Sequence, residues 1–134
     1  MLENSKVLNG WRVTIPKSFR EVVDFIRAAD FPVPCDVRFN ANLRALEVIP
    51  RETKAEASPP AEFDFETGVA PSRIALYPPK NQMRLSLPSV LGGTLLLPDI
   101  GKPVLLRARN ELIEVWTPEN YVDWLKNNQE DEER

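Results

Sequence analysis

Two short stretches of the chain share one pattern of hydrophobic and polar positions. Arg12–Pro16 reads Arg-Val-Thr-Ile-Pro, and Arg84–Pro88 reads Arg-Leu-Ser-Leu-Pro. In each, two apolar residues alternate with an arginine and a hydroxyl residue, which is the pattern of a strand with one buried face. The closing proline cannot donate a ladder hydrogen bond and suits the first turn of a helix. The pattern therefore predicts two similar strands, each followed by helical structure.

The helix predicted after the first strand is longer than the one after the second. It has an apolar face with residues three and four positions apart, formed by Phe19, Val22, Val23 and Ile26. Pro32 and Pro34 follow, so this helix should fade by Asp30. In the second copy, Gly92 and Gly93 interrupt the helix at a cost of roughly 1 kcal/mol per glycine relative to alanine.

Other alternating stretches predict two hairpins and one more strand. The first hairpin turns at Asn40-Ala41-Asn42, where asparagine tolerates a positive φ. The second turns at residues 109–111. The predicted strands are Val37–Phe39 with Leu43–Ile49, Val104–Ala108 with Leu112–Trp116, and Arg73–Tyr77. Residues 1–8 form a lead-in with no predicted element.

Two further segments flank these elements. Phe63-Asp64-Phe65 could add an edge strand with both phenylalanines buried, which would leave Glu62, Asp64 and Glu66 on an acidic, solvated edge. A final helix is expected to begin at Thr117-Pro118, a good N-cap and N1 pair. Its predicted apolar side consists of Tyr121, Val122, Trp124 and Leu125.

The order of these parts indicates an internal repeat. Arg12–Pro16 and Arg84–Pro88 are 72 residues apart, and Leu46-Glu47-Val48 and Ile113-Glu114-Val115 are 67 residues apart. Between these markers each half has a helical segment, a proline-bearing connection and an asparagine-bearing hairpin. We therefore expect a first unit at 1–50, a linker with the edge strand at 51–71, a second unit at 72–126 and a disordered polar tail at 127–134.

Composition and charge restrict the chemistry of the chain. The 134 residues carry a net charge of −3, with no histidine and one cysteine, Cys35. A His/Cys metal site and a histidine-activated nucleophile are therefore excluded within one chain, and so is an intrachain disulfide. We expect that the protein is not an enzyme and that it uses no cofactor. A role in nucleic-acid binding would need a local basic patch, because the whole chain is mildly acidic.

The same features suggest where the protein acts. A single thiol fits a reducing compartment. No apolar run approaches membrane-spanning length, and the first residues lack a signal-peptide pattern. We expect a cytoplasmic protein without a membrane partner.

The repeated motif resembles a known superfamily. Residues 12–21, Arg-Val-Thr-Ile-Pro-Lys-Ser-Phe-Arg-Glu, resemble the strand-to-helix motif of the AbrB/MazE/SpoVT swapped-hairpin DNA-binding domains. The second half continues with Ser72-Arg73, Arg84–Pro88, Ile113–Trp116 and a helix bearing Tyr121 and Trp124. That order is similar to the MraZ family, in which two such units are fused in one chain.

The resemblance implies a fold and a function. The expected fold is mainly β with short helices (α+β), in which two tandem swapped-hairpin units form a small pseudo-two-fold barrel. The expected function is transcription regulation by binding double-stranded DNA, with association with the nucleoid and assembly into a homo-oligomer. Both half-size units would leave apolar surface and strand edges, which also favours an oligomer.

The chain departs from the family pattern at several positions. The family's turn usually carries an aspartate four residues before the strand arginine and a glycine just before it. Leu8 and Trp11 occupy these positions in the first copy, and Gly10 sits one place early. The family arginine four residues after the proline is present as Arg20, whereas its second-copy equivalent is Gly92. An alternative is therefore a protein-interaction or assembly module, antitoxin-like, that has the same fold but has lost DNA binding.

Candidate DNA contacts follow from the positive residues near the motifs. DNA binding needs cations spaced to meet phosphates and base edges. The candidates are Lys6, Arg12, Lys17, Arg20, Lys80 and Arg84. Lys17 and Arg20 are expected to share a helix face. A competing interpretation makes these residues ordinary outward strand residues and a solvated helix face. Trp11 is the tryptophan most suited to an interface.

Overall fold

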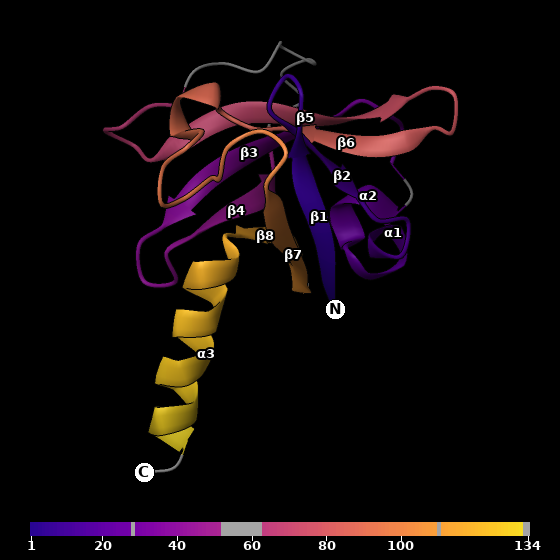
Figure 1. Cartoon of the computed structure of the whole chain (residues 1–134). Helices are drawn as coiled ribbons and strands as arrows, with labels where there is room; N and C mark the ends of the chain where they lie inside the picture. Colours follow the sequence, from indigo (N-terminus) through magenta and orange to yellow (C-terminus); the bar gives the residue numbers. More distant parts are fainter. Residues whose placement is uncertain (28, 52–62, 110, 133–134) are drawn as a thin grey trace.

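The protein is a closed, antiparallel, eight-stranded β-barrel with a few short helices (Figure 1). The computed structural model describes residues 1–27, 29–51, 63–109 and 111–132. The strands are β1 (Leu2–Leu8), β2 (Arg12–Ile15), β3 (Val33–Asn40), β4 (Ala45–Pro50), β5 (Val69–Tyr77), β6 (Gln82–Ser86), β7 (Pro103–Arg109) and β8 (Leu112–Trp116). The helices are α1 (Phe19–Val22), α2 (Asp24–Arg27), the 3₁₀ turn η1 (Ser89–Leu91) and α3 (Pro118–Glu132). The mainly β prediction is confirmed at this level.

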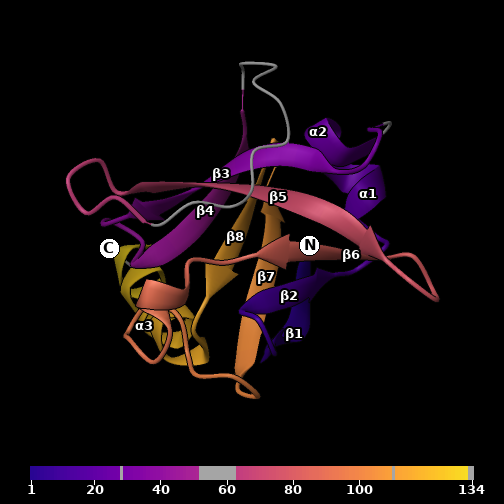
Figure 2. The ribbon, with the colours of Figure 1, turned by 90° about the horizontal axis from the view of Figure 1, so that it is seen from above.

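The strands follow the order β1-β2-β6-β5-β3-β4-β8-β7 around the barrel. Seen from above, β2, β6 and β5 lie side by side (Figure 2). Alternate residues of each strand point inward, as a half-buried strand requires. Val13, Ile15, Met83 and Leu85 are among these inward residues, and they belong to a single hydrophobic core cluster. Phe19, Val23 and Ile26 join that cluster from the helical segments.

The strand order is unchanged when β1–β4 are exchanged with β5–β8. Each strand pairs with one strand of its own half and one of the other half. In the β2–β6 pair, Val13 lies opposite Leu85, the residue 72 positions later. In the β4–β8 pair, Glu47 lies opposite Glu114, the residue 67 positions later. The two spacings found in the sequence thus coincide with cross-strand partners at two places in the barrel.

The predicted lead-in at residues 1–8 is wrong, because β1 occupies it. β1 pairs with β7 over Leu2–Lys6 and with β2 at Val7 and Leu8. Val7 is the one buried residue of this strand, so the segment shows almost no hydrophobic alternation. Its position is fixed by backbone pairing on both sides, a long-range interaction that a local pattern does not report.

The first predicted helix is present as two short pieces. Val23 separates α1 from α2 in an extended conformation, with φ −95° and ψ 113°. Phe19, Val23 and Ile26 are buried as expected, whereas Val22 is 36% exposed. Phe19, Val23 and Ile26 have the i, i+4, i+7 spacing that shares one face of a continuous helix, so their burial does not reveal the break. Helical spacing therefore identified most of the buried residues but gave the wrong backbone.

The region between the two halves contains one incorrect prediction. β4 ends at Pro50, and the linker residues 52–62, with Glu62, lie outside the described residues. Phe63 is buried, but Phe65 is 72% exposed. The predicted edge strand is reduced to a single bridge between Asp64 and Val69. Asp64 instead accepts hydrogen bonds from the backbone N–H groups of Glu66 (2.8 Å) and Thr67 (3.4 Å), which forms a turn.

The C-terminal helix begins where predicted but runs further. The Asn120 backbone N–H donates to Thr117 Oγ1 at 3.2 Å, the expected N-cap bond. Residues 127–132 continue α3, so the predicted disordered tail is wrong for that part, and 133–134 lie outside the described residues. Tyr121 and Trp124 pack against Trp116 with centroid distances of 5.4 and 5.6 Å.

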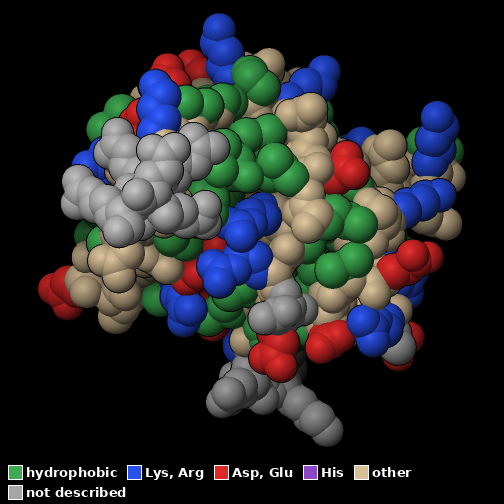
Figure 3. All heavy atoms as spheres, turned by 90° about the horizontal axis from the view of Figure 1, so that it is seen from below, with side chains coloured by type: hydrophobic (Ala, Val, Ile, Leu, Met, Phe, Trp, Pro, Cys, Tyr) green, Lys and Arg blue, Asp and Glu red, His purple; other side chains and the backbone are tan. Residues whose placement is uncertain are grey.

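Beyond that contact, α3 projects away from the barrel (Figure 1). Val122 and Leu125, two members of its predicted apolar side, stay 47% and 37% exposed. The face seen from below has Lys and Arg side chains interspersed with Asp and Glu around hydrophobic side chains (Figure 3). This side of the molecule therefore carries charges of both signs and is neither a basic nor an acidic surface.

Candidate nucleic-acid interface

The outer surface of β2, β6 and β5 carries the two arginines of the repeated motif. Val13 and Ile15 point into the core, so Arg12 and Thr14 point outward. Arg12 lies opposite Ser86, and Thr14 lies opposite Arg84. Both arginines are therefore brought to one outer face, as predicted for outward strand residues.

One aromatic ring holds both guanidinium groups. The guanidinium carbon of Arg12 lies 4.9 Å from the centroid of the Tyr77 ring, and that of Arg84 lies 5.0 Å from it. Each contact is a cation–π interaction worth about 0.5–1 kcal/mol at an exposed site. Arg84 also donates from Nη2 to Gln82 Oε1 at 3.1 Å. Its buried Nε has no hydrogen-bond partner among the described residues.

Arg73 is a third arginine on this surface, and sequence reasoning did not select it. It lies on β5 between the buried residues Ser72 and Ile74, so its side chain points outward. Together with Arg12 and Tyr77 it lines a surface groove. The alternation of residues 73–77 already indicated this orientation. Arg73 was not among the candidate contacts because it lies outside the repeated Arg-x-x-x-Pro motif.

Positive charge is segregated on this surface. β2, β5 and β6 contain no aspartate or glutamate. Within the described ranges, no ion pair involves Arg12, Arg73 or Arg84. Four arginines of the β3-β4-β8-β7 side are paired with carboxylates instead, in the pairs Arg38–Glu47 (2.9 Å), Arg51–Asp36 (3.1 Å), Arg107–Glu114 (3.6 Å) and Arg109–Glu114 (3.1 Å). An overall acidic chain thus has a locally basic face.

The other four predicted DNA contacts lie on different elements and do not form one cluster with Arg12 and Arg84. Lys6 is exposed on β1 and lines a shallow groove with Thr14. Lys80 is exposed in the turn between β5 and β6. Lys17 lies in the turn before α1, so the predicted shared helix face of Lys17 and Arg20 is not formed. Arg20 is exposed on α1 but is directed to the loop before β3, where its guanidinium lies 5.0 Å from the Phe31 ring and donates to the Ala29 carbonyl at 3.4 Å.

Trp11, the predicted interface residue, packs within the molecule. A β-carbon added at Gly92 would lie 2.1 Å from the Trp11 ring, so only glycine fits beneath the indole. The Trp11 carbonyl also accepts a 2.7 Å hydrogen bond from the Leu87 backbone N–H. This contact gives a physical reason for glycine at the position where the first copy has Arg20.

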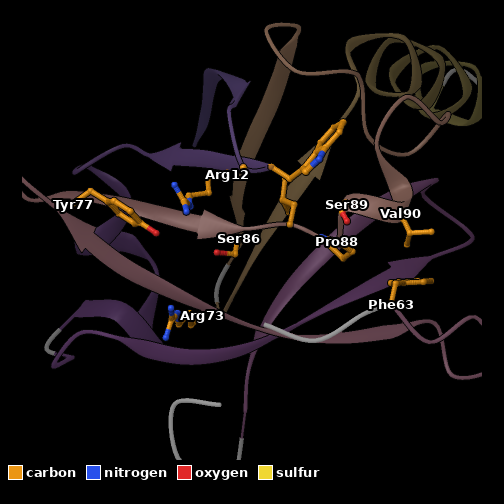
Figure 4. A pocket seen from close by; sticks show the side chains of 11 residues that line it. Arg12, Phe63, Arg73, Tyr77, Ser86, Pro88, Ser89 and Val90 are labelled. Atoms are coloured by element: carbon orange, nitrogen blue, oxygen red, sulfur yellow. The ribbon is translucent and has the colours of Figure 1, made fainter. Parts of the chain in front are cut away.

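The groove beside these residues has a volume of about 620 Å³. Figure 4 shows Arg12, Arg73 and Tyr77 toward one end and Phe63, Pro88 and Val90 toward the other. Ser86 lies between the two ends. The groove is therefore positively charged at one end and apolar at the other.

The remaining reactive groups do not form a second site. Cys35 is fully buried, and burial raises the pKa of its thiol to about 12, so it stays protonated at neutral pH. In the described part of the chain, no three His, Cys, Asp or Glu side chains gather where they could hold a metal ion. None of the described helices has the length and apolar character that a membrane crossing requires.

Comparison with known proteins gave no match, either among protein-family models or among curated proteins. Function is therefore inferred from the chain's own residues and geometry.

Proposed function

We propose that this chain is a DNA-binding transcription regulator of the AbrB/MraZ type, built from two tandem swapped-hairpin units around a pseudo-two-fold axis. The strand order supports this architecture, since it is unchanged when the two halves are exchanged. The pairing of Val13 with Leu85 and of Glu47 with Glu114 agrees with an axis that passes through both strand pairs.

The observation that carries the functional proposal is the outer face of β2, β5 and β6, three strands that contain no aspartate or glutamate and that carry Arg12, Arg73 and Arg84. Guanidinium groups bind phosphate oxygens in a bidentate manner and can read guanine in the same way. Tyr77 restricts the positions of Arg12 and Arg84 before a ligand arrives, which lowers the ordering cost of binding. Lys6, Lys17 and Lys80 would extend the contact as exposed charges around this centre.

The test compares duplex binding by the wild type and by the double variant Arg12→Gln/Arg84→Gln. Affinity for random-sequence and genomic duplexes is measured at several salt concentrations. Loss of two phosphate contacts should reduce affinity and flatten the slope of log K against log salt by about 1.8, or about 0.9 per contact. Circular dichroism checks that both proteins are folded.

A charge-matched control is Arg44→Gln/Lys126→Gln. Both residues are exposed, in the β3–β4 turn and on α3, away from β5 and β6 (Figure 1). This control should keep the wild-type salt slope. Equal losses in the two double variants would show a nonspecific charge effect, and no binding by the wild type at low salt would rule out the DNA-binding function.

A second candidate function is protein interaction or assembly, favoured by the apolar residues Val122 and Leu125 on the projecting helix α3. A homo-oligomer is expected under both functions. Light scattering should give a mass above the 15.3 kDa of one chain. The variant Val122→Ser/Leu125→Ser should shift the mass downward if α3 mediates assembly. A wild-type mass of one chain at micromolar concentration would contradict the expected oligomer.

A further inference from the structure

The groove on the arginine face has an ordered polarity that simple phosphate-backbone binding does not require. Cationic groups, Arg12 and Arg73, lie toward one end, with the Tyr77 hydroxyphenyl group beside them (Figure 4). The hydroxyl group of Ser86 follows, between the two ends. Apolar side chains close the other end, where Phe63 and Val90 lie. Backbone phosphates alone would use the first of these three zones.

We propose that the groove is a binding site for a nucleoside monophosphate unit. Its phosphate would lie at the arginine end, its sugar beside Ser86 and its base against the apolar end. The charge, hydroxyl and apolar zones of the groove occur in the same order as the phosphate, sugar and base of this ligand. The inference goes beyond duplex binding, because a base paired within a duplex does not present its flat face to a groove.

The arginine end is suited to a phosphate dianion. Arg12 and Arg73 both line this end of the groove, and Arg84 lies on β6 between their two strands. Within the described residues no carboxylate neutralises them. A phosphate would supply the missing negative charge and several acceptor oxygens. Arg73 approaches the groove from β5, which β6 separates from β2, so a bound phosphate would be contacted from both β2 and β5.

The apolar end is suited to a flat ring. Phe63 lines the groove with Leu87, Pro88 and Val90, next to Trp11, whose ring packs on Gly92. Packing of a nucleobase against aromatic side chains tolerates every base, because each base has an apolar face. Phe63 is held in place by an edge-to-face contact with Phe65 at 5.3 Å. The volume of about 620 Å³ falls within the range of about 300–1,000 Å³ that is typical of small-molecule sites.

The nucleoside monophosphate unit could belong to a free mononucleotide or to the phosphorylated end of a single strand. Calorimetry on the full chain at physiological salt uses AMP, GMP, CMP and UMP as probes. Adenosine and inorganic phosphate are the matched partial ligands. A short single-stranded oligonucleotide is added with a 5′-phosphate and, separately, with a 5′-hydroxyl.

A nucleotide should bind at least about tenfold more tightly than adenosine or phosphate, as expected when a charge-assisted bond and a stacked ring act together. If the 5′-phosphorylated oligonucleotide binds more tightly than the mononucleotides and the 5′-hydroxyl form does not, the site is supported with a strand end as its source. Equal affinity for inorganic phosphate and AMP would overturn the inference, as would no nucleotide binding at millimolar concentration.

Two variants examine the ends of the groove separately. Arg73→Gln should weaken nucleotide binding by about tenfold or more, the loss expected for one charge-assisted bond, while Arg44→Gln should not. Val90→Glu should weaken binding by placing a carboxylate at the apolar end. Ile100→Glu is its control, because Ile100 is 41% exposed and Val90 43% exposed, and Ile100 does not line the groove. Unchanged binding in both Arg73→Gln and Val90→Glu would place the ligand elsewhere and overturn the site.

This inference and the proposed function can fail independently. Duplex binding depends on salt and on Arg12 and Arg84, and is measured with duplexes alone. If the protein binds nucleotides but not duplexes, the nucleotide site in the groove is supported and the DNA-binding function is rejected. The opposite pattern would support the function and reject the groove.

Discussion

Glu114 lies fully buried on β8 and is held by three groups. Arg107 and Arg109 approach its carboxylate at 3.6 and 3.1 Å, and the indole N–H of Trp116 donates to it at 3.0 Å. Its cross-strand partner Glu47 is also buried and pairs with Arg38 at 2.9 Å. The four strands β3, β4, β8 and β7 therefore carry one cross-strand row of charged residues, Arg38-Glu47-Glu114-Arg107. In this Arg-Glu-Glu-Arg row, the arginine at each end pairs with the glutamate beside it.

Replacing Glu114 with glutamine should destabilise the fold. The change removes the negative charge and replaces one of the two acceptor oxygens with an NH2 donor, so the groups around it, Arg107, Arg109 and the Trp116 N–H, share a single neutral acceptor. Breaking a buried pair costs about 3–5 kcal/mol, and the partial exposure of both arginines should reduce this to about 2 kcal/mol. Urea unfolding measures the difference.

Glu111→Gln is the control, because Glu111 is exposed on the turn before β8. Its free energy of unfolding should stay within about 0.5 kcal/mol of the wild type. A Glu114→Gln protein as stable as this control would mean that the Arg-Glu-Glu-Arg row contributes no net stability. The burial of Glu114 could not be predicted from the sequence, because a glutamate within a strand pattern is normally assigned to the solvated face.

At the scale of elements, residues with clear alternation were the predictable ones. β2, β6 and the β7–β8 hairpin were predicted close to their observed bounds, because their inward residues are apolar and because turn residues separate β7 from β8. β1 was missed because its sequence has one buried residue and its position depends on pairing with β7 and β2. The break at Val23 was missed because buried residues of a broken helix can keep helical spacing.

The candidate site was predictable only in part for a related reason. Alternation placed Arg12 and Arg84 outward, and the repeat made both of them candidate DNA contacts. Their meeting at Tyr77 depends on the pairing of β5 with β6, which joins segments by register and not by local pattern. Arg73 and the groove follow from that same pairing. Sequence therefore gave the orientation of the main cations but not their partners.

For the whole molecule, the strand order predicts that neither half is an independent domain. Every strand has one neighbour from each half, so separating the halves would leave four strand pairs unmade. A protease site inserted between positions 51 and 63 should allow the chain to be cut while the halves stay associated. The cut protein should elute as one species and unfold in a single transition in urea.

The control is the same insertion without protease treatment, which should behave as the wild type. Separation of the two fragments in native buffer, or two distinct unfolding transitions, would contradict interdigitated halves. It would also remove the architectural support for the tandem swapped-hairpin proposal.

The Trp11–Gly92 contact has a consequence for how such a chain could arise. Arg20 and Gly92 each stand four residues after the closing proline of their copy. If two first halves paired with each other, each Trp11 would meet an arginine where it now meets a glycine with no space for even a β-carbon. At this contact the two halves are therefore complementary and not equivalent, with the tryptophan in the first half and the glycine in the second. A barrel assembled from two copies of the first half would lack this glycine, whereas the present chain supplies it from its second half.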